Sequence, residues 1–129
     1  GMMGGRDPDC RRTMVWDTLQ WNIDLQNFYK KVIKIRNENP VLRCGSYQTL
    51  LTDTKKNLFA FMREYENQKA VVILNNNEKC RKVSIPLPGN VSKEYYDILN
   101  DKTIKVPTTS NYLLIEDMPP YSGLILISR

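Results

Sequence analysis

The 129-residue sequence contains no histidine, so it lacks both the imidazole base of most nucleophilic sites and the commonest metal ligand. Its three cysteines are an odd number, and no two of them lie close together in the sequence. This pattern excludes a complete disulfide framework and a structural zinc site of the usual spacing. We therefore expect no metal and no cofactor, and any chemistry would have to use carboxylates, lysine or tyrosine.

Long apolar runs are missing as well. No segment approaches the roughly 20 residues that a membrane-spanning helix requires, so we predict no membrane partner. The sequence does not open with a basic segment followed by an apolar one, and from this we expect a cytoplasmic protein. With 41% hydrophobic and 26% charged residues, the chain has the composition of a folded domain.

The charge is positive but dispersed. The net charge of +5 comes from 19 basic and 14 acidic residues, and acidic residues separate the basic ones along the whole chain. No stretch interleaves arginine with aromatic residues, as proteins that bind single-stranded nucleic acid do. Dispersed charge favours a solvated surface over a nucleic-acid footprint. We therefore predict no nucleic-acid partner.

The hydrophobic pattern divides the chain into three parts. Residues 1–23 show no period and are predicted to be irregular, whereas residues 24–39 are predicted to form a helix that Asn22 or Asp24 can cap. Pro40 ends this helix, because its ring disfavours helical geometry at the preceding residue. The apolar stripe of the helix consists of Leu25, Phe28, Tyr29, Val32 and Ile33.

Residues 40–129 are predicted to be all β, because short apolar runs separated by turn residues replace the helical period. In the run 83–87 apolar and other residues alternate as in a half-buried strand, and Pro86 places that strand at a sheet edge. The expected strands are 47–51, 58–65, 70–74, 83–87, 95–99, 104–106, 112–115 and 124–127. Seven or eight short strands at this spacing imply a sandwich or barrel. We predict a mainly β protein, an antiparallel β-sandwich of the Greek-key type preceded by one α-helix and an irregular N-terminal segment.

The segment 4–12 holds the residues with the clearest potential for binding. Asp7 and Arg11 are four residues apart on a loop shaped by Gly4, Gly5 and Pro8. A carboxylate beside a guanidinium can hydrogen-bond the vicinal hydroxyls of a sugar. The two side chains could equally pair with each other and only hold the loop, and the residues alone leave both interpretations open.

The run GGRDPDCRRTMVWD, residues 4–17, resembles a segment of the α-amylase family of glycoside hydrolases, and is most similar to its neopullulanase and cyclomaltodextrinase branch. Residues 28–43 resemble the last helix of the family's catalytic barrel and its exit. The remainder is similar to the closing all-β domain, down to residues 119–124. The resemblance implies that Asp7 and Arg11 are substrate-binding residues that contact a glucose unit of an α-glucan or maltooligosaccharide.

The resemblance also implies what the chain lacks. In the family the catalytic carboxylates lie on earlier strands of a barrel that needs about 250 residues. The chain alone is therefore predicted to be a structural, inactive part of a glycoside hydrolase, with no catalytic residue of its own. The acidic residues on or beside predicted strands are interpreted as surface charge: Glu64, Glu66, Asp97, Glu116 and Asp117.

Three expectations remain attached to this interpretation. Trp16 and Trp21 could stack on sugar rings, but burial beneath the barrel end is the favoured use of their large apolar surface. Without barrel strands to pack on, the helix stripe is expected to self-associate or to fold against the β domain. A free-standing carbohydrate-binding module, with tyrosines as stacking platforms, is the alternative function.

Overall fold

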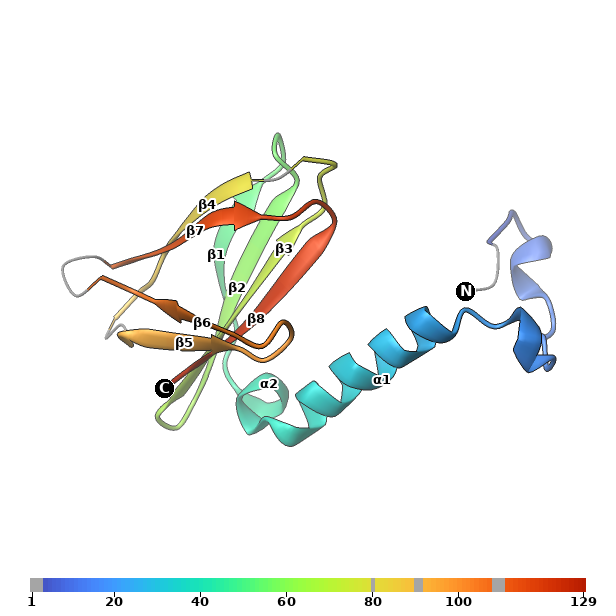
Figure 1. Ribbon diagram of the computed structural model, residues 1–129, viewed down its shortest axis with the longest axis horizontal. Coiled ribbons are helices and arrows are strands. Elements are labelled where there is room, and N and C mark those ends of the chain that lie inside the picture. Colours follow the sequence, from blue (N-terminus) through green and yellow to red (C-terminus); the bar gives the residue numbers. More distant parts are fainter. Residues whose placement is uncertain (1–3, 80, 90–91, 108–110) are drawn as a thin grey trace. The chain divides into compact units, whose positions relative to one another are not determined.

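The computed structural model describes residues 4–79, 81–89, 92–107 and 111–129 (Figure 1). The chain separates into two compact units, Gly1–Lys34 and Ile35–Arg129. The first unit contains two short 3-10 helices, η1 (Asp9–Arg11) and η2 (Thr18–Gln20), followed by most of helix α1 (Ile23–Glu38). The described residues of the second unit form the end of α1, a short helix α2 (Pro40–Cys44) and eight strands.

Helix α1 begins where the sequence predicts. The side-chain oxygen of Asn22 accepts a hydrogen bond of 2.9 Å from the backbone N–H of Leu25, which satisfies one of the free donors of the first turn. Of the two residues proposed as caps, Asn22 is thus the one that acts. The helix ends at Glu38, and Asn39 is extended (φ −116°, ψ 102°), as expected for a residue that precedes proline.

Helix α2 was not predicted. Pro40 ends α1 and at the same time begins α2, because proline fits the first turn of a helix, where its missing N–H is not needed. Val41 and Leu42 are buried, and α2 contacts strands β2 and β3. The region after residue 40 is therefore a β domain with a helical turn at its start.

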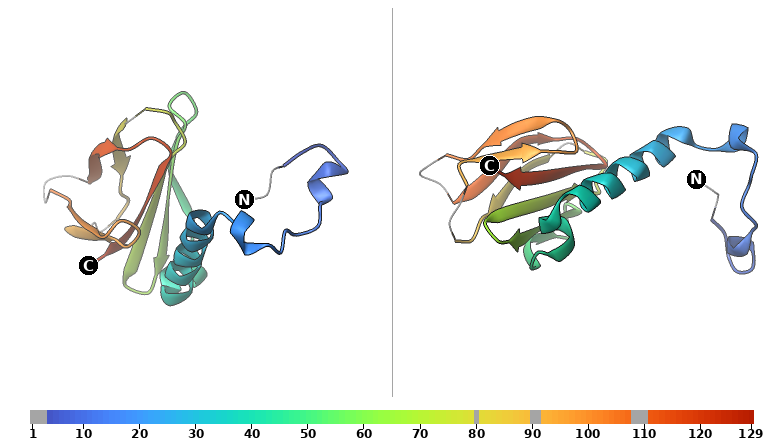
Figure 2. Two further views of the ribbon diagram at one scale, coloured as in Figure 1. Left: turned by 45° about the vertical axis from the view of Figure 1, so that its right-hand side comes forward. Right: turned by 90° about the horizontal axis from the view of Figure 1, so that it is seen from below.

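Each of the eight predicted strand runs overlaps one strand of the described residues, with bounds that differ by at most a few residues. The strands are β1 (Gln48–Asp53), β2 (Leu58–Tyr65), β3 (Gln68–Asn75), β4 (Arg81–Pro86), β5 (Glu94–Asp97), β6 (Lys102–Lys105), β7 (Tyr112–Met118) and β8 (Ser122–Ser128). Six strands form one antiparallel sheet in the order β1-β2-β3-β8-β5-β6, and β4 pairs with β7 in a second sheet (Figures 1 and 2). Strands far apart in sequence are neighbours, as in Greek-key sandwiches. The predicted antiparallel β-sandwich is confirmed.

The core lies between the two sheets. In β4 the side chains of Val83 and Ile85 are at most 1% exposed, whereas Ser84 and Pro86 are exposed, so the predicted alternation is correct. Pro86 closes a strand of the two-stranded sheet, in which each strand is an edge. The buried apolar residues of this core are Leu58, Ala60, Met62, Val71, Ile73, Val83, Ile85, Leu87, Tyr95, Val106, Leu113, Ile115, Met118 and Leu126.

Asp97 corrects one prediction. It was interpreted as surface charge, but its side chain is 0% exposed. One carboxylate oxygen accepts hydrogen bonds from the backbone N–H groups of Leu99 and Ile125, at 3.1 and 3.2 Å, and the other accepts one from Asn100 Nδ2 at 2.7 Å. A buried charge is tolerated when such donors replace water. The other acidic residues of that group are exposed: Glu64, Glu66, Glu116 and Asp117.

Candidate functional site

The structure brings Asp7 and Arg11 together. Arg11 Nη2 donates to Asp7 Oδ2 at 3.1 Å, and Arg11 Nε lies 2.9 Å from Asp7 Oδ1, which makes the contact bidentate. The loop that presents them is tight, since the Arg11 backbone N–H donates to the Pro8 carbonyl at 2.9 Å. Both side chains are more than 60% exposed, so the ion pair contributes little stability in water.

Two interpretations of Asp7 and Arg11 were left open, sugar binding and a pairing that only holds the loop. Asp7 and Arg11 do hold each other, as the purely local interpretation expects. A carboxylate nevertheless has four lone-pair positions and a guanidinium has five N–H donors, so a paired Asp7 and Arg11 can still bind hydroxyls of a ligand. A second exposed pair, between Arg12 and Asp9 at 3.8 Å, lies on the same loop and is looser.

An open groove of about 1000 Å³ lies in the N-terminal unit. Its lining residues begin at Arg12, directly after the Asp7–Arg11 loop in the sequence. Trp21 forms part of its wall and is held there by a 2.6 Å hydrogen bond from its indole N–H to the Val15 carbonyl. Trp16 is 77% exposed and is not part of the lining. The lining residues are Arg12, Thr13, Met14, Val15, Gln20, Trp21, Asn22, Leu25, Gln26 and Tyr29.

Sequence analysis missed most of this groove. Met14 and Val15 lie in a segment without any hydrophobic period, so nothing marked them as neighbours of the helix residues Leu25 and Tyr29. Trp21 was singled out as a residue that could stack on sugar rings or be buried beneath the barrel end, not as part of a groove. The lining joins residues 12–15 with residues 20–29, and between them Asp17 caps η2 by accepting a 3.0 Å hydrogen bond from the Leu19 N–H.

The apolar stripe of α1 consists mostly of exposed side chains. Phe28, Tyr29 and Ile33 are each at least 50% exposed and Leu25 is 38% exposed, whereas Val32 is partly buried. Large apolar side chains clustered on a surface usually mark a contact with another protein surface. The two outcomes expected for the stripe, self-association and packing on the β domain, stay predictions.

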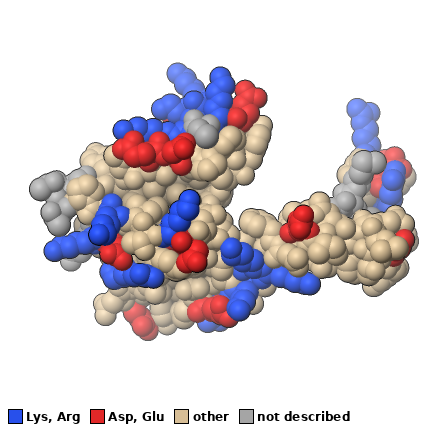
Figure 3. Space-filling view, viewed as in Figure 1, with Lys and Arg blue, Asp and Glu red and all other residues tan. Residues whose placement is uncertain are grey.

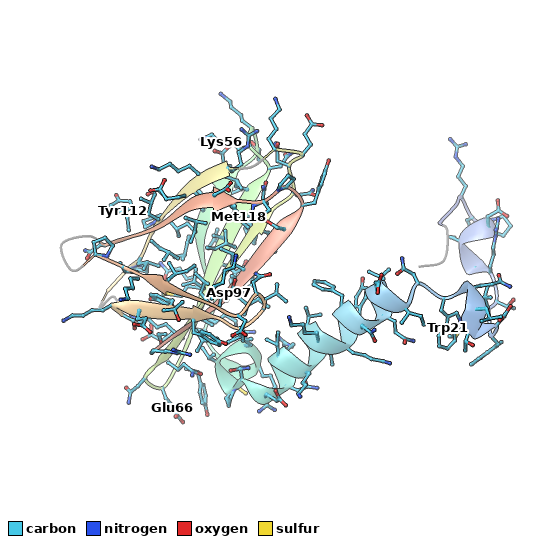
Figure 4. All side chains as sticks on the ribbon, viewed as in Figure 1. Trp21, Lys56, Glu66, Asp97, Tyr112 and Met118 are labelled. Atoms are coloured by element: carbon cyan, nitrogen blue, oxygen red, sulfur yellow. The ribbon has the colours of Figure 1, made fainter. Side chains whose placement is uncertain are left out.

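The β domain offers a smaller hollow of about 400 Å³ near the turn between β2 and β3. Tyr65, Asn67 and Gln68 are among its lining residues, and Glu66 projects at the tip of the turn (Figure 4). Arg129, also in the lining, lies over the Tyr96 ring with its guanidinium carbon 4.2 Å from the ring centroid. This hollow is shallow and mixed in polarity.

Three further observations concern metal binding, membrane crossing and surface charge. Within the described part of the chain, no three acidic or cysteine side chains gather closely enough to hold a metal ion. The described helices include none whose length and hydropathy would allow it to cross a membrane. Figure 3 shows basic and acidic side chains interspersed over the visible face of the β domain.

The fold and the arrangement of these residues define an accessory β-sandwich domain, with an N-terminal unit that carries an exposed ion pair and an open apolar surface. Residues 47–125 match the family described as Maltogenic Amylase, C-terminal domain. The chain belongs to this family, whose relatives are glycoside hydrolases of the α-amylase group.

The chain is 40% identical over 126 residues to a cyclomaltodextrinase of Thermoanaerobacter pseudethanolicus, and the matched region covers 98% of the chain but 20% of that enzyme. It is 33% identical over 126 residues to neopullulanase 2 of Thermoactinomyces vulgaris, covering 98% of the chain and 21% of the enzyme. The chain thus spans about a fifth of the length of these relatives.

Solved structures of amylases superimpose on this chain. The maltogenic amylase from S. marinus superimposes with a TM-score of 0.68 at 30% identity, over 100% of this chain and 16% of that one. The Anoxybacillus α-amylase superimposes with a TM-score of 0.81 over 98% of this chain and 26% of that one. At 24% identity, the second similarity concerns the fold alone.

Proposed function

We propose that this chain is the C-terminal part of an α-glucan-acting glycoside hydrolase, in which its β domain is structural and non-catalytic. The observation that carries the proposal is the match to cyclomaltodextrinase over 98% of the chain but 20% of the enzyme. The proposed substrate, an α-glucan such as a maltooligosaccharide, follows from the names of the relatives.

The β domain supports a structural role through its own construction. Its two sheets enclose a core of fully buried side chains, so the domain can fold as a unit. Glycoside hydrolysis requires two carboxylates flanking the bond. The buried Asp97 uses both oxygens on donors of the fold, and Glu116 is 67% exposed and paired with Lys82 at 2.8 Å, so neither is placed for that task.

A chimera tests the proposal directly. In the Thermoanaerobacter cyclomaltodextrinase, the matched region would be replaced by this chain, and release of reducing ends from maltooligosaccharides would be measured. We expect an active chimera and no turnover by the chain alone. Turnover by the chain alone that disappears when one of its carboxylates is mutated would overturn the non-catalytic role. An unfolded or inactive chimera would overturn the family role.

The chimera also tests Asp7 and Arg11 as substrate contacts. We expect Asp7→Ala or Arg11→Ala to raise KM by about tenfold or more, since a hydrogen-bonded charged contact is worth at least about 1.4 kcal/mol. Asp9→Ala is the matched control, because Asp9 is an exposed carboxylate of the same loop with only a 3.8 Å partner. Equal effects of Asp7→Ala and Asp9→Ala would assign the Asp7–Arg11 pair to loop shape alone.

The second candidate function is a free-standing carbohydrate-binding module. It is favoured by the exposure of two aromatic side chains, Trp16 at 77% and Tyr121 at 71%, because exposed aromatic rings stack on sugars. Calorimetric titration of the chain with maltoheptaose separates the two functions. Binding with a Kd of about 1 mM or tighter, −4.1 kcal/mol, would favour the module, and a flat titration would discard it.

A further inference from the structure

The hollow beside the turn between β2 and β3 is lined almost entirely by polar side chains. It measures about 400 Å³, which is within the range of sites for small ligands. Its lining residues all belong to the second unit, and they come from α2, the β2–β3 hairpin, the segment before β5 and the end of the chain (Figure 1). We call them the turn hollow: Pro40, Tyr65, Glu66, Asn67, Gln68, Ser92, Ser128 and Arg129.

The composition of the turn hollow favours a neutral ligand with many hydroxyl groups. Its charged side chains are one carboxylate, Glu66, and one guanidinium, Arg129, so the net charge selects neither an anion nor a cation. Only Pro40 and Tyr65 offer apolar surface, while the other residues offer amide and hydroxyl groups that both donate and accept hydrogen bonds. A sugar ring matches this combination, because it has an apolar C–H face and a rim of hydroxyls.

Two side-chain amides of the turn hollow are available to a ligand. Within the described part of the chain, the amides of Asn67 and Gln68 have no hydrogen-bond partner, although Gln68 is partly buried. A partly buried amide loses free energy unless a group from outside the chain satisfies it. Each amide has two N–H donors and an oxygen with two lone pairs, so the two together can bind several hydroxyls.

Another part of the lining is held in place by contacts within the β domain. The guanidinium carbon of Arg129 lies 4.2 Å from the centroid of the Tyr96 ring, and its Nη1 lies 3.7 Å from Glu94 Oε1. Ser128 Oγ accepts a 2.9 Å hydrogen bond from the Lys69 N–H, so its own hydroxyl hydrogen can be donated to a ligand. Side chains that are already ordered lose little conformational entropy when a ligand binds.

Glu66 occupies a position at which glycine is the usual residue. Tyr65 pairs with Gln68, so residues 66 and 67 alone form the turn, and Glu66 has a φ of 54°. A non-glycine residue at positive φ is strained, and such strain concentrates at binding sites. Because glycine would form the same turn without strain, what glutamate adds is an exposed carboxylate that can accept hydrogen bonds from hydroxyls (Figure 4).

We infer that the turn hollow is a binding site for a short stretch of an α-glucan. The inference rests on the proposed function for the kind of sugar, and on the lining residues for the site. Tyr65, 38% exposed, stacks on the C–H face of a glucose ring, and Asn67 and Gln68 bind its hydroxyls. Because the hollow is open, we expect a Kd for maltoheptaose of about 5–10 mM, weaker than the value of about 1 mM that would favour a free-standing module.

Nuclear magnetic resonance of the 15N-labelled chain, titrated with maltoheptaose, tests the inference. We expect the side-chain NH2 signals of Asn67 and Gln68 to shift, because they report directly on hydrogen bonds at the turn hollow. Tyr65→Ala and Gln68→Ala should each weaken binding by about threefold or more, since one loses the stacked ring and the other an amide. The matched controls are Tyr121→Ala and Asn76→Ala, which remove an exposed tyrosine and an exposed asparagine outside the hollow and should leave the Kd unchanged.

The same spectra show whether each variant is folded, because a folded β domain gives dispersed amide signals. If about 50 mM maltoheptaose shifts neither NH2 signal, the inference is wrong. It is also wrong if Tyr121→Ala abolishes binding while Tyr65→Ala and Gln68→Ala do not. The chimera described above separates the two proposals: an active chimera with unshifted signals overturns the inference alone, whereas an inactive chimera with shifted signals overturns the proposed function and supports the sugar site.

Discussion

Arg36 and Arg63 donate hydrogen bonds to the same acceptor, the carbonyl oxygen of Leu42 in α2. Arg63 reaches it at 2.6 Å and also donates to the carbonyls of Gly45, at 2.7 Å, and Ser46, at 3.2 Å. The last carbonyls of a helix have no partner within the helix, and cationic side chains are favourable there. One arginine from β2 thus fastens the short helix to the large sheet.

Replacing Arg63 by methionine should destabilise the β domain by about 1–3 kcal/mol, because the carbonyls of α2 lose a charged donor while the apolar stem is retained. Urea denaturation followed by circular dichroism measures the change. Arg129→Met is the control: Arg129 has an exposed ion pair with Glu94 at 3.7 Å and should cost less than about 1 kcal/mol. Equal losses for the two variants would contradict the role of Arg63.

Gly45 lies where the chain passes between helix and sheet too closely for a side chain. A Cβ atom at this position would clash with the Val41 carbonyl oxygen and would lie 3.1 Å from that of Glu64. Gly45→Ala should therefore destabilise the domain by about 1–3 kcal/mol, since backbone must move to make room. Thermal unfolding measures this effect. Gly4→Ala, where nothing lies within 4 Å, should leave the midpoint unchanged.

Asn75, 2% exposed, joins the end of β3 to segments on both sides of it. Its amide nitrogen donates to the carbonyls of Pro119 at 2.7 Å and Lys79 at 3.1 Å, and its oxygen accepts from the Asn77 N–H at 3.1 Å. Asn75→Ala should cost about 2–4 kcal/mol in chemical denaturation, because buried backbone groups lose their partners. The exposed neighbour provides the control, and Asn76→Ala should cost under about 0.5 kcal/mol.

We expect the stability of the fold to fall at alkaline pH because of Tyr95. Burial raises the pKa of its hydroxyl above the usual 10.0, and its neighbour Ser92 lowers that pKa only in part. A raised pKa means that the folded state favours the neutral phenol, so this stabilisation is complete below pH 10.0 and is lost as the pH rises through the folded-state pKa.

The variant Tyr95→Phe isolates this contribution. Its free energy of unfolding at neutral pH should lie within about 1 kcal/mol of the unmodified chain, since only the hydroxyl is removed. Its stability should fall less steeply than that of the unmodified chain between about pH 9 and pH 11, the range in which tyrosine titrates. Parallel slopes in urea denaturation across that range would show that Tyr95 contributes nothing to the alkaline loss.

The features that could be predicted from the sequence are those that depend on residues nearby in the chain. Short apolar runs between turn residues indicated the eight strands of the described residues. Asn22 and Asp24 were the two candidate caps for α1, and Asn22 caps it because a cap acts within its own turn. The pairing of Asp7 with Arg11 is also local, at a spacing of four residues, and the structure shows it. Their role toward a sugar stays a prediction.

Two of the features that were not predicted depend on hydrogen bonds with residues far away in the sequence. Helix α2 is secured by Arg63, which bonds to a carbonyl 21 residues earlier in the chain. The burial of Asp97 depends on the Ile125 N–H, 28 residues later, and no local pattern distinguishes Asp97 from a surface acid. The groove beside Trp21 joins residues 12–15, from a segment that has no period, with residues 20–29.

The position of β8 determines the order in which this domain can be completed during synthesis. Ser122–Ser128 lies between β3 and β5, so the last of these eight strands to be synthesised joins the two halves of the large sheet. Until it does, β1-β2-β3 and β5-β6 remain separate hairpin assemblies with exposed edges that can pair with other nascent chains. A product shortened before residue 122 should therefore be a target for proteolysis, not a slightly smaller version of the same domain.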